Sequence, residues 1–166
     1  MKISRYIKEE LVKLEMETVI EPPDETMSID RWRQNSKELV LKELVDLLNE
    51  NARVGNRNKL LFDFINREKK ASTAIGSGVA IPHIRSKHAS EFMMAFARSG
   101  KGYDFESIDG KPTHLFFVMA APPYDDNLYL KVFKALAEML QYDSFRDELM
   151  TISSPGELIR SIRSME

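Results

Sequence analysis

The sequence predicts an α/β domain in which helices and strands alternate and pack in layers. Residues 41–48 carry leucine and valine at helical spacing, which is typical of an amphipathic helix. Residues 115–121 form a nearly continuous apolar run, which is typical of a strand buried on both faces. Patterns of these two kinds alternate along most of the chain, and this order favours the α/β class. The 166 residues fit one domain, so we expect residues 1–166 to form a single unit.

The N-terminal part of the chain has the weakest patterns. We expect a short helix over residues 4–12 and a short strand at residues 18–20. Residues 21–26 combine two prolines with acidic side chains, a composition that continues neither a helix nor a central strand. The pattern stays irregular to residue 35. Asn35 and Glu38 have the spacing of a capping box, so we expect the first long helix to begin at Asn35.

The middle of the chain predicts a helix followed by a loop. Gly55 and Asn56 mark a turn, and the apolar face of the next helix lies at residues 60–65, with its end near residues 67–70. Residues 72–78 have the composition of a loop. A short apolar segment at 79–81 follows, and Pro82 ends it because proline donates no hydrogen bond to a sheet.

The second half predicts two strands and three helices. Residues 92–97 and 115–121 are the strands, and the turn-rich residues 100–112 separate them. A helix is expected to start near Asp126, with Tyr129 and Phe133 on its apolar face. Two short helices close the chain. Ser154, Pro155 and Glu157 have the residue types preferred at positions N-cap, N1 and N3 of the last helix.

Composition excludes several classes of function. The 24 basic and 26 acidic residues leave a net charge of -2, which is no electrostatic footprint for nucleic acid. Cysteine is absent, which removes thiolate nucleophiles, disulfides and cysteine-rich zinc sites. No apolar run approaches the roughly 20 residues that cross a bilayer, and the first residues lack the apolar region of a secretory signal. We therefore expect a cytoplasmic protein without membrane insertion.

The densest group of candidate functional residues is at Gly76, Ser77, Gly78 and His83. A Gly-Ser-Gly loop exposes backbone N–H groups that suit an anionic ligand. His83 follows Pro82, where the strand gives way to a loop. A neutral imidazole attacks phosphorus through one nitrogen if the other keeps its proton and a fixed acceptor. Residue chemistry alone favours the plainer interpretation of a loop histidine without a role.

The residues around His83 resemble a known signature. They are similar to the motif of the enzyme IIA domains of the fructose, mannitol and nitrogen-regulatory class, in the bacterial phosphoenolpyruvate-dependent phosphotransferase system. The matching residues are Arg67-Glu68, Ser72-Thr73, Ile75-Gly76 and Gly78-Val79-Ala80-Ile81-Pro82-His83. A second stretch agrees at Ala97-Arg98-Ser99, Gly102-Tyr103-Asp104-Phe105, Asp109-Gly110-Lys111-Pro112 and residues 115–122. The resemblance is collinear over residues 1–155 or so.

The resemblance implies a fold and a set of roles. The fold is a mixed five-stranded sheet flanked by helices on both faces. His83 accepts a phosphoryl group on Nε2 from an HPr-type carrier, beside Arg67 and Thr73, and Gly76, Ser77 and Gly78 contribute amides to a phosphoryl-binding loop. The group then passes to an enzyme IIB cysteine, or the phosphorylation state itself acts on a regulatory target. No cofactor or metal is implied, and a site made by His83, His88 and His114 would need three remote loops to meet.

Three departures from the family pattern leave alternatives open. Asn127 stands where the family usually has a second histidine, and unlike histidine it cannot carry a positive charge. It is either a site residue or an ordinary helix cap. Ile84 replaces the usual small residue after the histidine. Residues 21–35, with Trp32, form an irregular insertion. We expect a nitrogen-regulatory IIA, and the alternatives are a sugar-transport IIA of the fructose or mannitol type and a non-catalytic regulatory module with the same fold.

Overall fold

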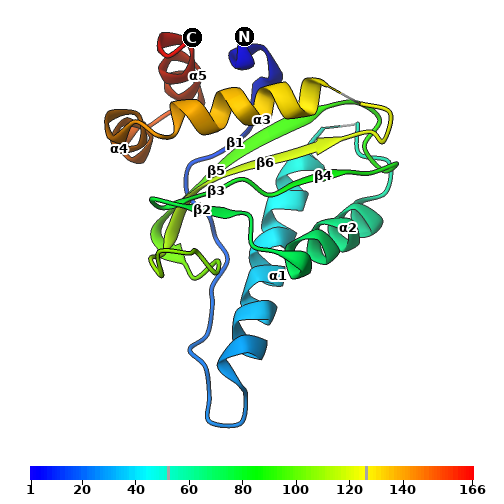
Figure 1. The fold of residues 1–166 in the computed structure, drawn as a ribbon, viewed down its shortest axis with the longest axis vertical. Coiled ribbons are helices and arrows are strands. Elements are labelled where there is room, and N and C mark those ends of the chain that lie inside the picture. Colours follow the sequence, from blue (N-terminus) through cyan, green and yellow to red (C-terminus); the bar gives the residue numbers. More distant parts are fainter. Residues whose placement is uncertain (52, 126) are drawn as a thin grey trace.

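A mixed β-sheet forms the centre of the structure, and helices cover both of its faces (Figure 1). This computed structural model describes residues 1–51, 53–125 and 127–166. The strands in those ranges are β1 (Ile7–Lys13), β2 (Ala74–Gly76), β3 (Val79–Ala80), β4 (His83–Arg85), β5 (Met93–Tyr103) and β6 (Thr113–Ala121). The helices are η1 (Ile3–Tyr6), α1 (Ile29–Leu48), α2 (Arg57–Lys70), α3 (Leu128–Met139), α4 (Asp143–Thr151) and α5 (Pro155–Ser164).

The antiparallel pair β5 and β6 forms the centre of the sheet. The strand order is β1-β5-β6-β3-β2, and β4 also pairs with β6. Pro82 separates β3 from β4, and both run parallel to β6, with Val79 opposite Leu115 and His83 opposite Met119. The prediction of an α/β sheet with helices on both faces is therefore confirmed. The sheet has six strands over the described residues rather than five, because Pro82 divides the segment that pairs with β6 into two short strands.

Side chains of β5 and β6 alternate between two cores, one on each face of the sheet. The core under α1 and α2 receives Ala95, Ala97, Phe116, Val118 and Ala120 from these two strands. The core under α3, α4 and α5 receives Met94, Phe96, Leu115, Phe117 and Met119. This period of two follows from the pleat of a strand, and it explains why the run reads as continuously apolar in the sequence.

The N-terminal predictions were wrong in three places. Residues 7–13 form strand β1 parallel to β5, not a helix, and residues 18–20 form no strand. Helix α1 begins at Ile29 rather than at Asn35, because the Ser28 hydroxyl caps it by accepting from the Arg31 amide at 3.2 Å. Ile7 and Leu11 are buried and four residues apart, a spacing that suits one face of a helix as well as one side of a strand. Pairing with β5 decides between the two.

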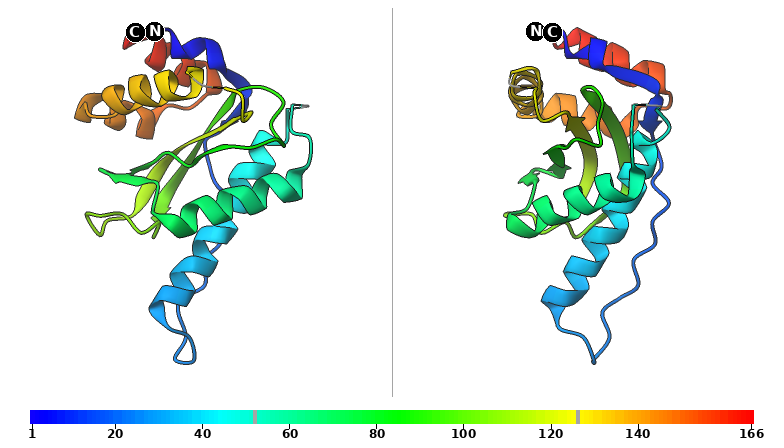
Figure 2. Two further views of the ribbon diagram at one scale, coloured as in Figure 1. Left: turned by 45° about the vertical axis from the view of Figure 1, so that its right-hand side comes forward. Right: turned by 90° about the vertical axis from the view of Figure 1, so that its right-hand side faces the viewer.

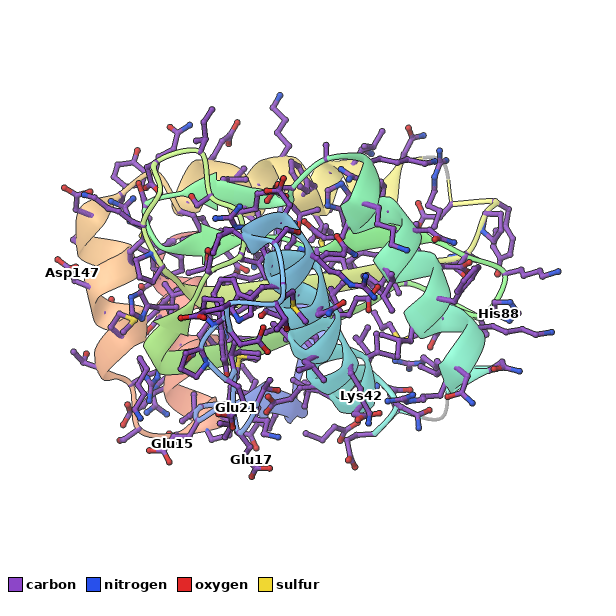
Figure 3. The ribbon with its side chains drawn as sticks, turned by 90° about the horizontal axis from the view of Figure 1, so that it is seen from below. Glu15, Glu17, Glu21, Lys42, His88 and Asp147 are labelled. Carbon is purple, nitrogen blue, oxygen red and sulfur yellow. The ribbon has the colours of Figure 1, made fainter. Side chains whose placement is uncertain are left out.

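Residues 21–28 and the first turns of α1 project from the domain as an arm (Figures 1 and 2). The extended segment runs alongside the helix, and the Trp32 indole donates to the carbonyl of Glu21 at 2.8 Å. The predicted irregular segment therefore ends at Ser28, since residues 29–35 are helical. Seen from below, Glu15, Glu17 and Glu21 point outward along one edge of the molecule (Figure 3).

Other elements largely follow the sequence patterns. Helix α2 covers residues 57–70 as predicted, and the strands predicted at 92–97 and 115–121 are confirmed within the longer β5 and β6. The expected loop at 72–78 contains a short strand, β2, which forms a hairpin with β3. The predicted helix start at Asp126 lies outside the described residues. Ser154 caps α5 through the Glu157 amide at 3.2 Å, as predicted, although the Glu157 carboxylate accepts from Ser153.

No helix in the described ranges combines the length and the apolar character needed to cross a membrane.

Candidate active site

His83 is the first residue of β4, directly after Pro82, and its ring is half-buried. Nδ1 lies 2.6 Å from the carbonyl oxygen of Ile81. A carbonyl only accepts hydrogen bonds, so the hydrogen of the neutral ring is on Nδ1 and the lone pair is on Nε2. Attack on phosphorus requires that one ring nitrogen keep its proton and a fixed acceptor, and Nδ1 of His83 meets this requirement in the structure.

The surroundings of the ring favour its neutral form. Burial lowers the pKa of His83 below its ordinary value of 6.5, and the positive charge of Arg67 adds to the decrease. The hydrogen bond to the Ile81 carbonyl and the negative charge of Glu68 oppose this shift of the pKa. Because burial dominates, Nε2 is unprotonated at neutral pH and is available as a nucleophile.

Two aromatic side chains of α3 form a wall beside the imidazole. The ring centroids of Phe133 and Tyr129 lie 4.9 Å and 5.7 Å from that of His83. They are four residues apart in the sequence, so they leave the same face of the helix. The sequence assigned both to the apolar face of a helix, and Phe133 to the core. In the structure they also restrict the rotation of the histidine ring.

Two guanidinium groups belong to this site. Arg67 is in the last turn of α2, where it donates to the carbonyl of Ala71 at 2.9 Å. Arg85 lies two residues after His83 on β4, so both side chains leave the same face of the strand. Its guanidinium carbon is 5.9 Å from the centroid of Tyr129, and it donates to the carbonyl of Asp125 at 3.4 Å. Burial raises the pKa of Tyr129, and the positive charges of Arg67 and Arg85 oppose this increase.

A basic groove of about 410 Å³ runs between α2 and β4. Its charged lining residues are Arg67, Lys70, Arg85 and Lys87, with Asp63 as the single carboxylate among the described lining residues. The Ser86 hydroxyl donates to Asp63 at 2.6 Å, which ties β4 to α2. This excess of positive charge suits an anionic group or a negatively charged protein surface. A larger cavity of about 720 Å³ lies between residues 14–20 and β5, and its described lining includes none of these basic side chains.

The structure does not bring the Gly76, Ser77 and Gly78 loop to His83. The loop adjoins Leu115 of β6, whereas His83 pairs with Met119, which is about 13 Å further along the strand at the usual rise per residue. The Ser77 amide donates to the carboxylate of Asp109 at 3.0 Å. This geometry does not support a direct contact between the loop and a phosphoryl group on His83. The two glycines serve a tight turn instead, with φ of 88° and 78°.

The structure also places the other predicted site residue, Thr73, as well as Asn127 and the two remaining histidines. Thr73 is buried, and its hydroxyl donates to the Glu68 carboxylate at 2.6 Å, so its hydrogen is already engaged. Asn127 is exposed at the N-cap of α3, the helix that supplies Tyr129, and among the described atoms its side chain caps no amide. His88 lies at the edge of the molecule (Figure 3), and Nδ1 of His114 is 2.9 Å from the Ser99 carbonyl.

Sequence reasoning missed Arg85 as a site residue. A strand of three residues is too short to show its own period, so nothing marked it as a strand. The sequence does show that Arg85 lies two residues after His83. In an extended chain, residues at this spacing place their side chains on the same face.

A mixed sheet that presents a neutral, half-buried imidazole near a groove lined by basic side chains is an arrangement suited to the transfer of an anionic group. Residues 25–165 match the family described as "Phosphoenolpyruvate-dependent sugar phosphotransferase system, EIIA 2", and the chain belongs to this family. The resemblance inferred from the motif around His83 is therefore confirmed.

Relatives in this family are named for different roles. The chain is 34% identical to a fructose-specific EIIA component of Haloferax volcanii, over 72% of this chain and 77% of that protein. It is 36% identical to a nitrogen regulatory protein of Bradyrhizobium diazoefficiens, over 79% of this chain and 84% of that one. It is also 31% identical over 96% of its length to a fructose-specific EIIABC component of Bacillus subtilis, of which it spans only 22%.

Solved structures agree on the fold. The nitrogen regulatory protein IIA-Ntr of Neisseria meningitidis superposes with a TM-score of 0.80 at 28% identity, over 96% of this chain and 98% of that one. The mannitol enzyme IIA of Escherichia coli, in complex with phosphorylated enzyme IIB, superposes with a TM-score of 0.73 at 18% identity, over 95% and 99% of the two chains. At that identity the second likeness shows the fold alone.

Proposed function

We propose that this chain is a histidine phosphocarrier of the phosphotransferase system, that His83 accepts its phosphoryl group from an HPr-type carrier, and that it acts as a nitrogen-regulatory IIA. The observation that carries the proposal is the hydrogen bond from Nδ1 to the Ile81 carbonyl, which leaves the lone pair on Nε2. The whole of residues 1–166 forms one such domain, with residues 21–28 and the start of α1 as its arm.

The transfer exchanges one phosphorus–nitrogen bond for another. The lone pair of Nε2 attacks the phosphorus of the donor phosphohistidine. The bond from phosphorus to the donor imidazole breaks, and its electron pair returns to the donor nitrogen. Nδ1 of His83 keeps its hydrogen and its bond to Ile81 throughout. The donor and acceptor nitrogens are roughly in line, so the protein contributes chiefly position and charge.

Charge on the transferred oxygens is stabilised by the two guanidiniums. Arg67 and Arg85 line the same basic groove, and Arg85 lies 5.9 Å from the ring of Tyr129, which packs against His83, so we expect both guanidiniums to be available to the phosphoryl oxygens. Guanidinium groups form strong, directional hydrogen bonds with phosphoryl oxygens. Asn127 at the start of α3 supplies a neutral donor, and Arg85 provides the second positive charge that asparagine cannot. Thr73 acts through Glu68 rather than on the phosphoryl group.

The regulatory role rests on the relatives. The IIA-Ntr structure matches nearly the whole of both chains, and the Bradyrhizobium relative is covered over 84% of its length. The second candidate is a sugar-transport IIA that passes the group to an enzyme IIB cysteine. The fructose EIIA relative favours it. Either role begins with phosphoenolpyruvate, a cytoplasmic metabolite, so we propose a cytoplasmic location.

The test is phosphorylation from purified components. We expect the chain, mixed with phosphoenolpyruvate, enzyme I and an HPr-type carrier, to gain one phosphoryl group by intact mass, in an acid-labile form. His83→Ala should abolish the gain, and His88→Ala, a change of the same kind five residues away, should leave it intact. A persistent adduct in His83→Ala would overturn the assignment. No adduct on the unmodified chain from any carrier tried would favour a non-catalytic binding module.

A further experiment separates the two carrier roles. The phosphorylated chain is mixed with purified enzyme IIB domains of the fructose and mannitol types. Transfer to a IIB cysteine within seconds would identify a sugar-transport IIA. Retention of the group in the presence of every IIB tested is expected of the regulatory protein.

A further inference from the structure

Lys37 of α1 carries a positive charge into the interior, where its side chain is only 2% exposed. Nζ lies 3.0 Å from Oε2 of Glu68 and 3.0 Å from Oε1 of Glu106, and it sits 5.1 Å from the ring centroid of Phe105. A buried ion pair adds little stability over an apolar substitute, because both charges lose their hydration. A role other than stability is therefore worth seeking for this pair.

Glu68 connects three parts of the chain. It is in the last turn of α2, next to Arg67, and its side chain is also 2% exposed. Besides Lys37 it accepts hydrogen bonds from the Thr73 amide at 2.7 Å and the Thr73 hydroxyl at 2.6 Å. One carboxylate thus ties α1, the end of α2 and the segment that enters β2.

The network continues from Thr73 to the active histidine. The Thr73 carbonyl accepts from the Ile81 amide at 3.0 Å, and the Ile81 carbonyl accepts from Nδ1 of His83 at 2.6 Å. The amide belongs to the Ala80–Ile81 peptide and the carbonyl to the Ile81–Pro82 peptide, so Thr73 fixes the backbone of Ile81 on the side away from His83. An unbroken series of polar contacts runs from the Lys37 ammonium to the imidazole.

We propose that Lys37, Glu68 and Thr73 are positioning residues, which hold the Ile81 carbonyl where it keeps the hydrogen of His83 on Nδ1 and leaves Nε2 free. The proposal rests on the proposed function, in which Nε2 is the attacking atom. A displacement of reacting groups by about 1 Å costs on the order of 100-fold in rate, so a loosened Ile81 peptide should slow transfer without contacting the phosphoryl group.

The chain offers a matched control on the same helix. Glu43 of α1 accepts from Lys13 Nζ at 2.8 Å, from the Thr18 amide at 2.9 Å and from the Thr18 hydroxyl at 2.5 Å. This clamp repeats the chemistry of Lys37, Glu68 and Thr73, but it fastens the extended segment at residues 13–18. Its described contacts do not include the Ile81 peptide or His83. Glu43→Gln is therefore the counterpart of Glu68→Gln.

The direct readout is the tautomer of His83 in the unphosphorylated protein. With ¹⁵N-labelled histidine only three rings contribute, and long-range ¹H–¹⁵N spectra distinguish protonated from unprotonated ring nitrogens. We expect the unmodified chain to hold the hydrogen on Nδ1. Glu68→Gln and Thr73→Val should shift the population toward the Nε2–H form and slow phosphotransfer about tenfold or more. Thr73→Ser restores the hydroxyl and should restore both, and Glu43→Gln should change neither.

Two results would overturn the proposal. One is an unchanged tautomer and rate in Glu68→Gln with native amide spectra. The other is the same shift in Glu43→Gln. If Glu68→Gln fails to fold, the comparison of Thr73→Val with Thr73→Ser decides, since Thr73→Val exchanges the hydroxyl for a methyl group whereas Thr73→Ser keeps the hydroxyl and removes the methyl group. The tautomer is read without any phosphoryl donor, so a chain that takes no phosphoryl group would refute the proposed function and leave this test intact.

Discussion

Replacing Lys37 by methionine should destabilise the protein more than any other loss of an ion pair considered above. Methionine has a similar length and volume, so the change removes the charge and leaves little cavity. The Glu68 carboxylate, itself 2% exposed, then lies in the interior without its nearest cation. Breaking a buried pair in this way costs about 3–5 kcal/mol. Thr73 still donates two hydrogen bonds to Glu68, so we expect the lower end, about 3 kcal/mol.

Urea denaturation followed by circular dichroism measures the loss directly. A loss of this size lowers the melting temperature by about 6–12 °C, at about 2–4 °C per kcal/mol for a chain of this length. The double variant Lys37→Met/Glu68→Gln removes both charges and should recover about 2 kcal/mol of the loss in a double-mutant cycle. Lys13→Met is the control, because that lysine is 31% exposed and its loss should cost about 1 kcal/mol or less. Equal losses in Lys37→Met and Lys13→Met, or no recovery in the double variant, would refute the reasoning.

Three further predictions concern the site. Arg67→Gln should slow phosphotransfer by about 100-fold and Arg85→Gln by about tenfold, because each removes a donor to the developing charge, and quench-flow with phosphorylated carrier measures both rates. A loss in Arg85→Gln no larger than in the control Lys87→Gln would remove Arg85 from the site. The pKa of His83 is lower in the folded protein than its ordinary 6.5, so the unfolded chain binds a proton first as the pH falls. Stability should therefore decline from about pH 6.5 downward, by at most about 1.4 kcal/mol per pH unit, until the folded pKa is passed, and His83→Asn should flatten this decline in urea titrations. An identical slope in His83→Asn contradicts the assignment. Asn127→Ala should change the transfer rate less than about threefold, since its exposed side chain caps no amide among the described atoms and Arg85 supplies the charge; a loss of tenfold or more would make Asn127 a principal donor.

The sequence predicted best where packing repeats a simple period. Residues 115–121 read as a buried strand because both faces of β6 are covered, and α2 read as a helix because one face packs on the sheet. At the N-terminus the patterns mislead. The buried Ile7 and Leu11 suit either a strand or a helix, and pairing with β5 is invisible in a local window. The start of α1 projects with the arm, so its first turns bury little and show no apolar stripe.

The site shows the same limit. His83 and Arg67 are sixteen residues apart in the sequence, and only the resemblance to the family linked them, because no local pattern connects residues at that spacing. The glycines at 76 and 78 suggested an anion site, but composition does not distinguish a ligand loop from a turn that needs positive φ. The hydrogen bond that sets the tautomer of His83 uses a backbone carbonyl, which every residue has, so no side-chain pattern could reveal it.

The central claim is that Nε2 of His83 carries the phosphoryl group while Nδ1 keeps its hydrogen. The most direct measurement is the one-bond ³¹P–¹⁵N coupling in the phosphorylated chain labelled with ¹⁵N-histidine, assigned by comparison with His88→Ala and His114→Ala. We predict a single coupled nitrogen, Nε2 of His83, with its Nδ1 still protonated. A coupling to Nδ1, or to a ring of another histidine, would contradict it.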